Sequence, residues 1–309
     1  MFHSIYDYTV TGIVITFTVQ FYGMTSQITM VECPRDAMQG WTHFIPTAEK
    51  VTYLNALLKV GFDVLDFGSF VSAKAIPQLA DTKDVIPQLD LSNTRTKLLA
   101  IVANTRGAEE AVQYDEITYI GFPFSVSETF QMKNTNKTIA QSLVQVEEIQ
   151  KLCIQHGKEL VIYISMGFGN PYGDEYNAQI AINWVNKITQ LGIKTIAMSD
   201  TVGVAKPDTI SHIFSHLIPE FKDVSIGAHF HSTPDKWEEK VKAAYDNGCV
   251  RFDSAMKGIG GCPMAENDLV GNLATENILG WCDNNDIKLN LNRDAFDDAM
   301  YMASGIFIS

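Results

Sequence analysis

The sequence VSIGAHFH, residues 224–231, is an apolar run that ends in two histidines. Such a run predicts a buried strand. Because side chains alternate between the two faces of a strand, His229 and His231 lie on one face at the strand's C-terminal end. Two imidazoles placed in this way are able to share one metal ion, although an isolated pair of histidines is weak evidence for a metal site.

The rest of the chain repeats the pattern of an apolar strand followed by an amphipathic helix. The first strand is expected to end in Pro34-Arg35-Asp36, with the next helix beginning near Pro46 or Thr47 and stopping at Gly61. Another helix is expected to open with a capping box at Thr138, and a later one to open at Thr233-Pro234 and close at Gly248. Besides the histidine strand, strands are predicted at residues 27–33, 62–67, 97–103, 117–122, 160–165, 193–198 and 250–254. Eight such units in one α/β chain predict a closed (β/α)8 TIM barrel, a single domain over residues 24–309.

Residues 1–23 differ in composition from the barrel. This segment is rich in β-branched and aromatic residues, and no Lys or Arg precedes Arg35. A signal peptide would need a basic start, and the apolar run is too short to span a membrane. We interpret the segment as an N-terminal extension, either an added strand or disordered, with Met24 as a candidate start of the natural protein.

Composition limits the partners of the chain. With 309 residues, 46% of them hydrophobic, it is able to bury a large core. A net charge of −13 argues against nucleic acid and anionic membranes as partners. The five cysteines are odd in number and lack paired metal-binding spacing, which favours reduced thiols and a cytoplasmic location.

Polar residues follow or end several predicted strands, at the face where TIM barrels carry out their chemistry. They are Asp36, Asp66, Asp200, the two histidines, Cys262 and Asn272. Of these, Asp36, His229, His231 and Asn272 offer two ring nitrogens, a carboxylate and an amide oxygen. This mixed set without thiolate suits an octahedral Mg²⁺ or Mn²⁺, with open positions for a substrate chelate.

Six motifs give the chain from Val31 onward a resemblance to the 3-hydroxy-3-methylglutaryl-CoA lyase family of metal-dependent barrels. They are ECPRDAMQ (32–39), GSFVSAKAIPQLAD (68–81), SVSETFQMKNTN (125–136), SDTVG (199–203), HFH (229–231), and GIGGCP through GNLATE (258–276). The resemblance implies cleavage of 3-hydroxy-3-methylglutaryl-CoA, or a close branched 3-hydroxyacyl-CoA, to acetyl-CoA and acetoacetate. It further implies roles in leucine degradation and ketone body formation, and a homo-oligomer, expected as a dimer.

The resemblance also implies roles for single residues. The four N/O ligands above become the metal site, and Arg35 and Asp200 lie at the reacting groups. Cys262, in a glycine-rich loop, is the implied catalytic thiol, and Glu276 resembles a supporting acid. Asp66 occupies the position usually held by Glu in the second strand, one methylene shorter.

Departures from the family pattern bear on the substrate. The segment Ser72-Ala73-Lys74-Ala75 lacks the usual tryptophan, which predicts a wider pocket there. Residues 232–235 and the length of the cysteine loop also differ from the pattern. Coenzyme A brings phosphates to an acidic protein, and the lysines near the expected top loops that could meet them are Lys74, Lys133, Lys137 and Lys206.

Two alternatives remain open at this point. A condensing synthase of the same superfamily, which joins acetyl-CoA to a 2-oxo acid, would resemble the barrel and its histidine pair. The segment CPMA at residues 262–265 favours the lyase, because such synthases typically carry a GERAGN-like segment there. A silent binding barrel is the other alternative, and it predicts the loss of a ligand or of the thiol, all of which are present.

Overall fold

The structure, a computed structural model, describes residues 9–10, 13–14, 27–261 and 270–308. Eight parallel strands form a closed barrel, because β10 pairs with both β9 and β3. The barrel strands are β3 (Thr29–Glu32), β4 (Val64–Ser69), β5 (Lys97–Ile101), β6 (Ile117–Ser125), β7 (Glu159–Ser165), β8 (Thr195–Asp200), β9 (Ser225–Ser232) and β10 (Arg251–Ser254). The predicted TIM barrel is confirmed.

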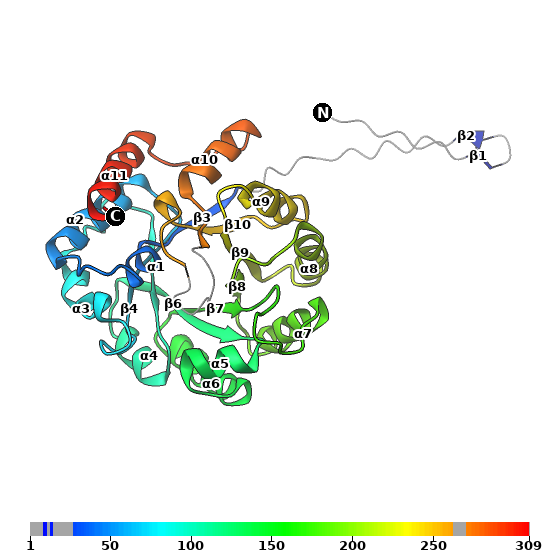
Figure 1. Cartoon of the computed structure of the whole chain (residues 1–309), viewed down its shortest axis with the longest axis horizontal. Helices are drawn as coiled ribbons and strands as arrows, with labels where there is room; N and C mark the ends of the chain where they lie inside the picture. Colours follow the sequence, from blue (N-terminus) through cyan, green and yellow to red (C-terminus); the bar gives the residue numbers. More distant parts are fainter. Residues whose placement is uncertain (1–8, 11–12, 15–26, 262–269, 309) are drawn as a thin grey trace.

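Helices form the outer layer around the strands (Figure 1). They are α1 (Pro34–Gln39), α2 (Thr47–Val60), α3 (Thr82–Val85), α4 (Thr105–Ala111), α5 (Glu128–Thr135), α6 (Ile139–Gln155), α7 (Ala178–Thr189), α8 (Pro207–Glu220), α9 (Trp237–Asp246), α10 (Thr275–Asn284) and α11 (Arg293–Ile306). Short 3₁₀ turns lie at η1 (Pro77–Leu79), η2 (Ile86–Gln88) and η3 (Met256–Gly258). Two further two-residue strands, β1 (Thr9–Val10) and β2 (Ile13–Val14), pair with each other.

The buried faces of the strands explain why this sequence forms a barrel. All six residues of β4 and all four of β10 are buried, as expected for strands covered on both sides. The predicted capping box is present, since Thr138 Oγ1 accepts from Gln141 N (3.1 Å) and Gln141 Oε1 accepts from Thr138 N (3.0 Å). The helix α6 therefore begins where the sequence indicates.

Two local expectations were wrong. Residues 34–36, expected only to end the first strand, open the short helix α1, because Pro34 suits the first helical position. The helix expected to open at Thr233 begins at Trp237 instead, after a turn in which Lys236 N donates to the carbonyl of Thr233 (3.1 Å).

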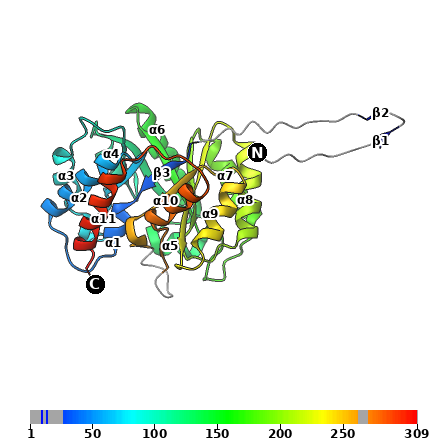
Figure 2. The same ribbon diagram turned by 90° about the horizontal axis from the view of Figure 1, so that it is seen from above.

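The end of the barrel at which the strands finish carries the short helices α1 and α5, which lie apart around the barrel in Figure 1 and on the same side of it in Figure 2. A short strand, β11 (Gly271–Asn272), pairs antiparallel with the end of β9 at the same mouth. Within the ranges given above, no helix has the length and apolar character needed to cross a membrane. The four described cysteines are free and buried.

Candidate metal site and active-site pocket

Three side chains that could hold a metal gather at the C-terminal mouth of the barrel. His229 and His231 come from β9, and Asp36 comes from α1, directly after β3. Their ligand atoms all lie within 4.8 Å of one another, and all three residues are buried. The structure thus brings together three of the four predicted metal ligands.

The two imidazoles are oriented from their Nδ1 sides. His231 Nδ1 donates to the carbonyl oxygen of Thr201 at 2.9 Å, since a carbonyl only accepts. His229 Nδ1 lies 3.2 Å from Asp253 Oδ2 on the neighbouring strand β10. Nε2 of His231 is buried and has no hydrogen-bond partner among the described residues. A buried, unprotonated ring nitrogen beside a carboxylate fits coordination of a divalent cation.

Asn272 closes this site from β11, where it lies opposite His231 in the strand pairing. Its Nδ2 donates to Asp36 Oδ2 (2.7 Å) and to the carbonyl of Ile259 (2.9 Å). The amide oxygen is therefore the atom that remains for a metal. The fourth predicted ligand is next to the other three, although its hydrogen bonds use the nitrogen.

The guanidinium of Arg35 lies beside this cluster, in a buried network. Nε and Nη2 donate to Asp66, with the shortest contact 2.6 Å to Oδ2. Nη1 donates to Asp36 Oδ1 (3.0 Å) and to Gln39 Oε1 (2.8 Å). Since an arginine has five N–H donors, one hydrogen on Nη2 has no partner among the described residues. Arg35 is held rigidly while one donor stays available.

Burial and charge set the protonation of these groups. Burial opposes ionisation of Asp36, but Arg35 and the two histidines outweigh it and hold the pKa of Asp36 below its usual value. For Asp66, burial outweighs the attraction of Arg35 and raises the pKa to about 6. Burial, together with the charge of His229, lowers the pKa of His231, which favours the neutral imidazole that a metal needs.

Asp200 ends β8, and its carboxylate is bonded to protein groups outside the three-residue cluster. Its Oδ2 accepts from Lys240 Nζ at 2.7 Å, and its oxygens accept from the backbone N–H groups of Val204 (2.8 Å) and Ala205 (3.1 Å). Both members of the ion pair are 1% exposed. The structure therefore places Asp200 at the base of the loop after β8, with its carboxylate already bonded.

Glu276 lies at the glycine-rich end of the site. Glu276 Oε2 accepts from the backbone N–H of Lys257 (3.0 Å), at the rim of the pocket. Cys262 lies outside the described residues, and its assigned role stays a prediction. Gly260 has φ +94°, and a Cβ there would lie 2.7 Å from the carbonyl oxygen of Asp36 and 2.8 Å from Asn272 Nδ2. Only glycine lets this loop approach the metal ligands so closely.

Two buried acids of the site were not singled out from sequence. Asp253 orients His229, and its place on the strand next to β9 is the signal that could have found it. Glu32 ends β3, where its oxygens accept from Met256 N (2.8 Å) and from Thr275 Oγ1 (2.5 Å). Burial raises the pKa of Glu32 to about 8. Its position at the end of an apolar strand is the sequence signal that could have identified Glu32.

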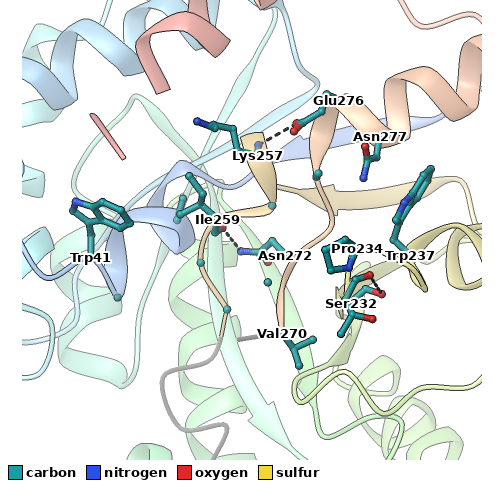
Figure 3. Close-up of a pocket in the computed structure, with 18 of the residues that line it drawn as sticks. Trp41, Ser232, Pro234, Trp237, Lys257, Ile259, Val270, Asn272, Glu276 and Asn277 are labelled. Atoms are coloured by element: carbon teal, nitrogen blue, oxygen red, sulfur yellow. Dashed lines mark hydrogen bonds between the residues drawn. The ribbon is translucent and has the colours of Figure 1, made fainter. Parts of the chain in front are cut away.

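A pocket of about 920 Å³ opens beside Asn272. In the close-up, Trp41 and Trp237 lie on opposite sides of it, with Asn272 between them (Figure 3). Its apolar walls include Trp41, Pro234, Trp237, Ile259 and Val270. Of the four predicted metal ligands, Asn272 lines this cavity. A largely apolar cavity with a few polar groups is the usual form of a small-molecule site.

Comparison with known proteins agrees with this geometry. The HMGL-like family model matches residues 27–300. The chain is 32% identical to the hydroxymethylglutaryl-CoA lyase YngG of Bacillus subtilis, over 84% of this chain and 85% of that one. It is 29% identical to a 3-hydroxy-3-isohexenylglutaryl-CoA/hydroxymethylglutaryl-CoA lyase of Pseudomonas aeruginosa, over 89% of this chain and 91% of that one.

A solved structure agrees as well. An HMG-CoA lyase from Acinetobacter baumannii, in complex with coenzyme A and 3-methylmalate, superimposes with a TM-score of 0.84 at 29% identity. The match covers 92% of each chain. Since the family model spans most of the chain and the relatives match over nearly their full length, the chain belongs to the HMGL-like family.

Proposed function

We propose that the chain cleaves 3-hydroxy-3-methylglutaryl-CoA, or a close branched 3-hydroxyacyl-CoA, in a retro-Claisen reaction. The observation that carries this proposal is the buried cluster of Asp36, His229 and His231 beside the Arg35 guanidinium. Membership of the HMGL-like family and the relative that binds coenzyme A support an acyl-CoA substrate. The products from the methyl compound are acetyl-CoA and acetoacetate.

The reaction removes the proton of the tertiary hydroxyl, breaks a carbon–carbon bond and leaves a thioester enolate that takes a proton on carbon. A Mg²⁺ or Mn²⁺ ion held by the histidines, Asp36 and Asn272 would supply Lewis acidity toward the substrate oxygens. Arg35 offers its remaining N–H to the oxygen on which negative charge develops. Asp66 positions that guanidinium through its short contacts with Nε and Nη2.

Cys262 is the proposed donor of the proton to the enolate carbon, a role that rests on the family motif. Glu276 supports the adjoining loop through its bond to the backbone of Lys257. Cys262→Ala is expected to lower kcat by roughly 10² to 10⁴, the usual contribution of a positioned acid or base, while substrate binding is nearly retained. A melting temperature measured on the same variant separates this role from packing. Turnover close to that of the wild type would remove Cys262 from the mechanism.

A product assay tests the proposed reaction directly. The purified chain with Mg²⁺ and 3-hydroxy-3-methylglutaryl-CoA is expected to release acetoacetate and acetyl-CoA in equal amounts. A parallel assay with acetyl-CoA and 2-oxo acids tests the condensing-synthase alternative. Condensation without cleavage would contradict the proposal.

We propose that the chain also accepts substrates with a branch longer than methyl at the tertiary carbon. The pocket has a volume of about 920 Å³, and its lining includes the apolar side chains of Trp41, Trp237 and Ile259. We expect kcat/KM for a substrate with a longer alkyl branch to be at least comparable to that for the methyl compound. A sharp preference for methyl would restrict the substrate to 3-hydroxy-3-methylglutaryl-CoA.

The remaining expectations follow from this activity. Lys74, Lys133 and Lys206 are exposed and Lys137 is half-buried, so we propose them as a group, not singly, to meet coenzyme A phosphates. A homodimer is a prediction that light scattering on the purified chain checks. Roles in leucine degradation and ketone body formation, and a cytoplasmic location, stay predictions.

A further inference from the structure

Lys240 is a buried lysine on α9 that the proposed reaction does not use. Its side chain is only 1% exposed. Nζ donates to Asp200 Oδ2 (2.7 Å), to the carbonyl of His231 (2.9 Å) and to the carbonyl of Gly203 (3.1 Å). An ammonium group has three hydrogens, so all of its donors have acceptors on the protein. Lys240 is therefore closed to substrate and acts only on its three neighbours.

All three acceptors belong either to His231 or to the chain next to the residue that orients its ring. One is the backbone carbonyl of His231 itself. The other two are Asp200, the last residue of β8, and Gly203, in the segment that follows it. That segment also carries Thr201, whose carbonyl accepts from His231 Nδ1 at 2.9 Å. The ammonium of Lys240 thus joins the backbone of the histidine to the segment that orients its ring.

Asp200 extends the same connection along the segment. Its carboxylate accepts from the N–H groups of Val204 and Ala205. The side chain of Asp200 therefore closes the segment from residue 200 to residue 205 into a loop. His231 Nε2 is buried and has no hydrogen-bond partner among the described residues, so no bond on that side holds the ring. A small rotation of the ring would therefore move Nε2 relative to Asp36. A rigid support for the ring is what a preorganised metal ligand requires.

We propose that Lys240 is a positioning residue that fixes His231 for metal binding, with Asp200 as its partner in that support. This inference rests on the proposed function, because it assumes that the cluster binds a divalent cation. In this inference the Lys240–Asp200 pair connects helix α9 to the metal ligand His231. In this proposal Asp200 acts on the metal ligand His231 through Lys240.

Mn²⁺ affinity of the metal-free chain, measured by electron paramagnetic resonance, tests the proposal without any need for turnover. Lys240→Met alone leaves the Asp200 charge buried and unpaired, which is expected to destabilise the fold. The double variant Lys240→Met with Asp200→Asn removes both charges and is the decisive protein. Lys242→Met is the matched control, because Lys242 is an exposed lysine on the same helix that pairs with Asp246.

The double variant is expected to bind Mn²⁺ about 10- to 100-fold more weakly than the wild type, the usual effect of removing a group that orients a metal ligand. The control should bind as the wild type does. In steady-state kinetics, kcat should fall and be partly restored at high Mn²⁺, with a smaller change in KM for the acyl-CoA. A merely structural role would lower the melting temperature and leave Mn²⁺ affinity unchanged.

Wild-type Mn²⁺ affinity in the double variant would overturn the inference, whatever its melting temperature. A wild-type chain that binds no Mn²⁺ would overturn it together with the metal site. If Mn²⁺ affinity changes as expected but no chain cleaves 3-hydroxy-3-methylglutaryl-CoA, the proposed function fails and the role of Lys240 stands.

Discussion

Two buried ion pairs flank the metal-ligating cluster, and they differ in how their cations are used. Arg35 pairs with Asp66 and touches Asp36, yet retains one N–H without a partner among the described residues. Lys240 pairs with Asp200, and all three of its ammonium hydrogens are donated to protein acceptors. The comparison indicates that a buried cation at a barrel mouth is not by itself catalytic. The number of free donors separates a group that reaches the substrate from one that supports a ligand.

The largest effect is expected from Arg35→Lys. Lysine keeps the charge but loses the planar fork that contacts Asp66 through two nitrogens, so the group is no longer fixed at the developing negative charge. We expect kcat to fall about 10²- to 10³-fold, the usual effect of removing one preorganised donor. Arg95→Lys is the control, because the exposed Arg95 bonds, among the described residues, only the carbonyls of Gly61 and Asn290. Retention of wild-type kcat in Arg35→Lys would make the arginine structural.

The partner acids give a sharper contrast between the two pairs. Asp66→Asn is expected to lower kcat roughly tenfold while Mn²⁺ affinity is kept, because it loosens Arg35. The double variant Lys240→Met with Asp200→Asn is expected to do the reverse, with Mn²⁺ affinity at least about tenfold weaker, because it removes the support of His231 without leaving a buried charge unpaired. Both quantities are to be measured on both variants. Equal loss of both in each variant would show that the pairs are not separate.

Glu32, a buried acid near the C-terminal end of the barrel, tests how burial affects the charge of a carboxyl group there. Within the described residues Glu32 has no ion-pair partner, and burial raises its pKa from 4.5 to about 8. The native state then binds more protons than the unfolded state between these values, so the contribution of Glu32 to stability is lost as pH rises from about 4.5 to about 8. Glu32→Gln, which imitates the protonated acid, should flatten this part of the melting-temperature profile. A profile parallel to that of the wild type would contradict the shifted pKa.

The smallest effect is expected from removal of residues 1–23. The first barrel strand, β3, begins at Thr29, so a chain that starts at Met24 retains every barrel element. Its melting temperature and kcat should equal those of the full chain. A clear drop in melting temperature would show that the extension contributes to the fold.

The barrel was predictable because its signals are local. Each strand is a short apolar run, and caps such as that at Thr138 mark where helices begin. The grouping of Asp36 with the two histidines followed from the rule that parallel strands present their C-terminal ends at one mouth. These residues needed no contact information to be identified.

The supporting residues were not predictable in the same way. Asp253 meets His229 only through the register of β10 with β9. Lys240 reaches Asp200 only because α9 packs against β9, the strand next to β8. In the sequence, Lys240 is an ordinary charged residue of an amphipathic helix. Contacts between elements, not residue types, decide whether such a side chain is buried and what it supports.

The central claim is that a divalent cation on Asp36, His229 and His231 enables cleavage of the acyl-CoA. Acetoacetate release is to be measured after exhaustive chelation and during titration with Mg²⁺ or Mn²⁺, alongside His231→Ala with its melting temperature. We predict that chelation abolishes activity, that activity returns as one ion binds per chain, and that His231→Ala stays folded but binds the ion weakly. Full turnover in excess chelator would contradict the account.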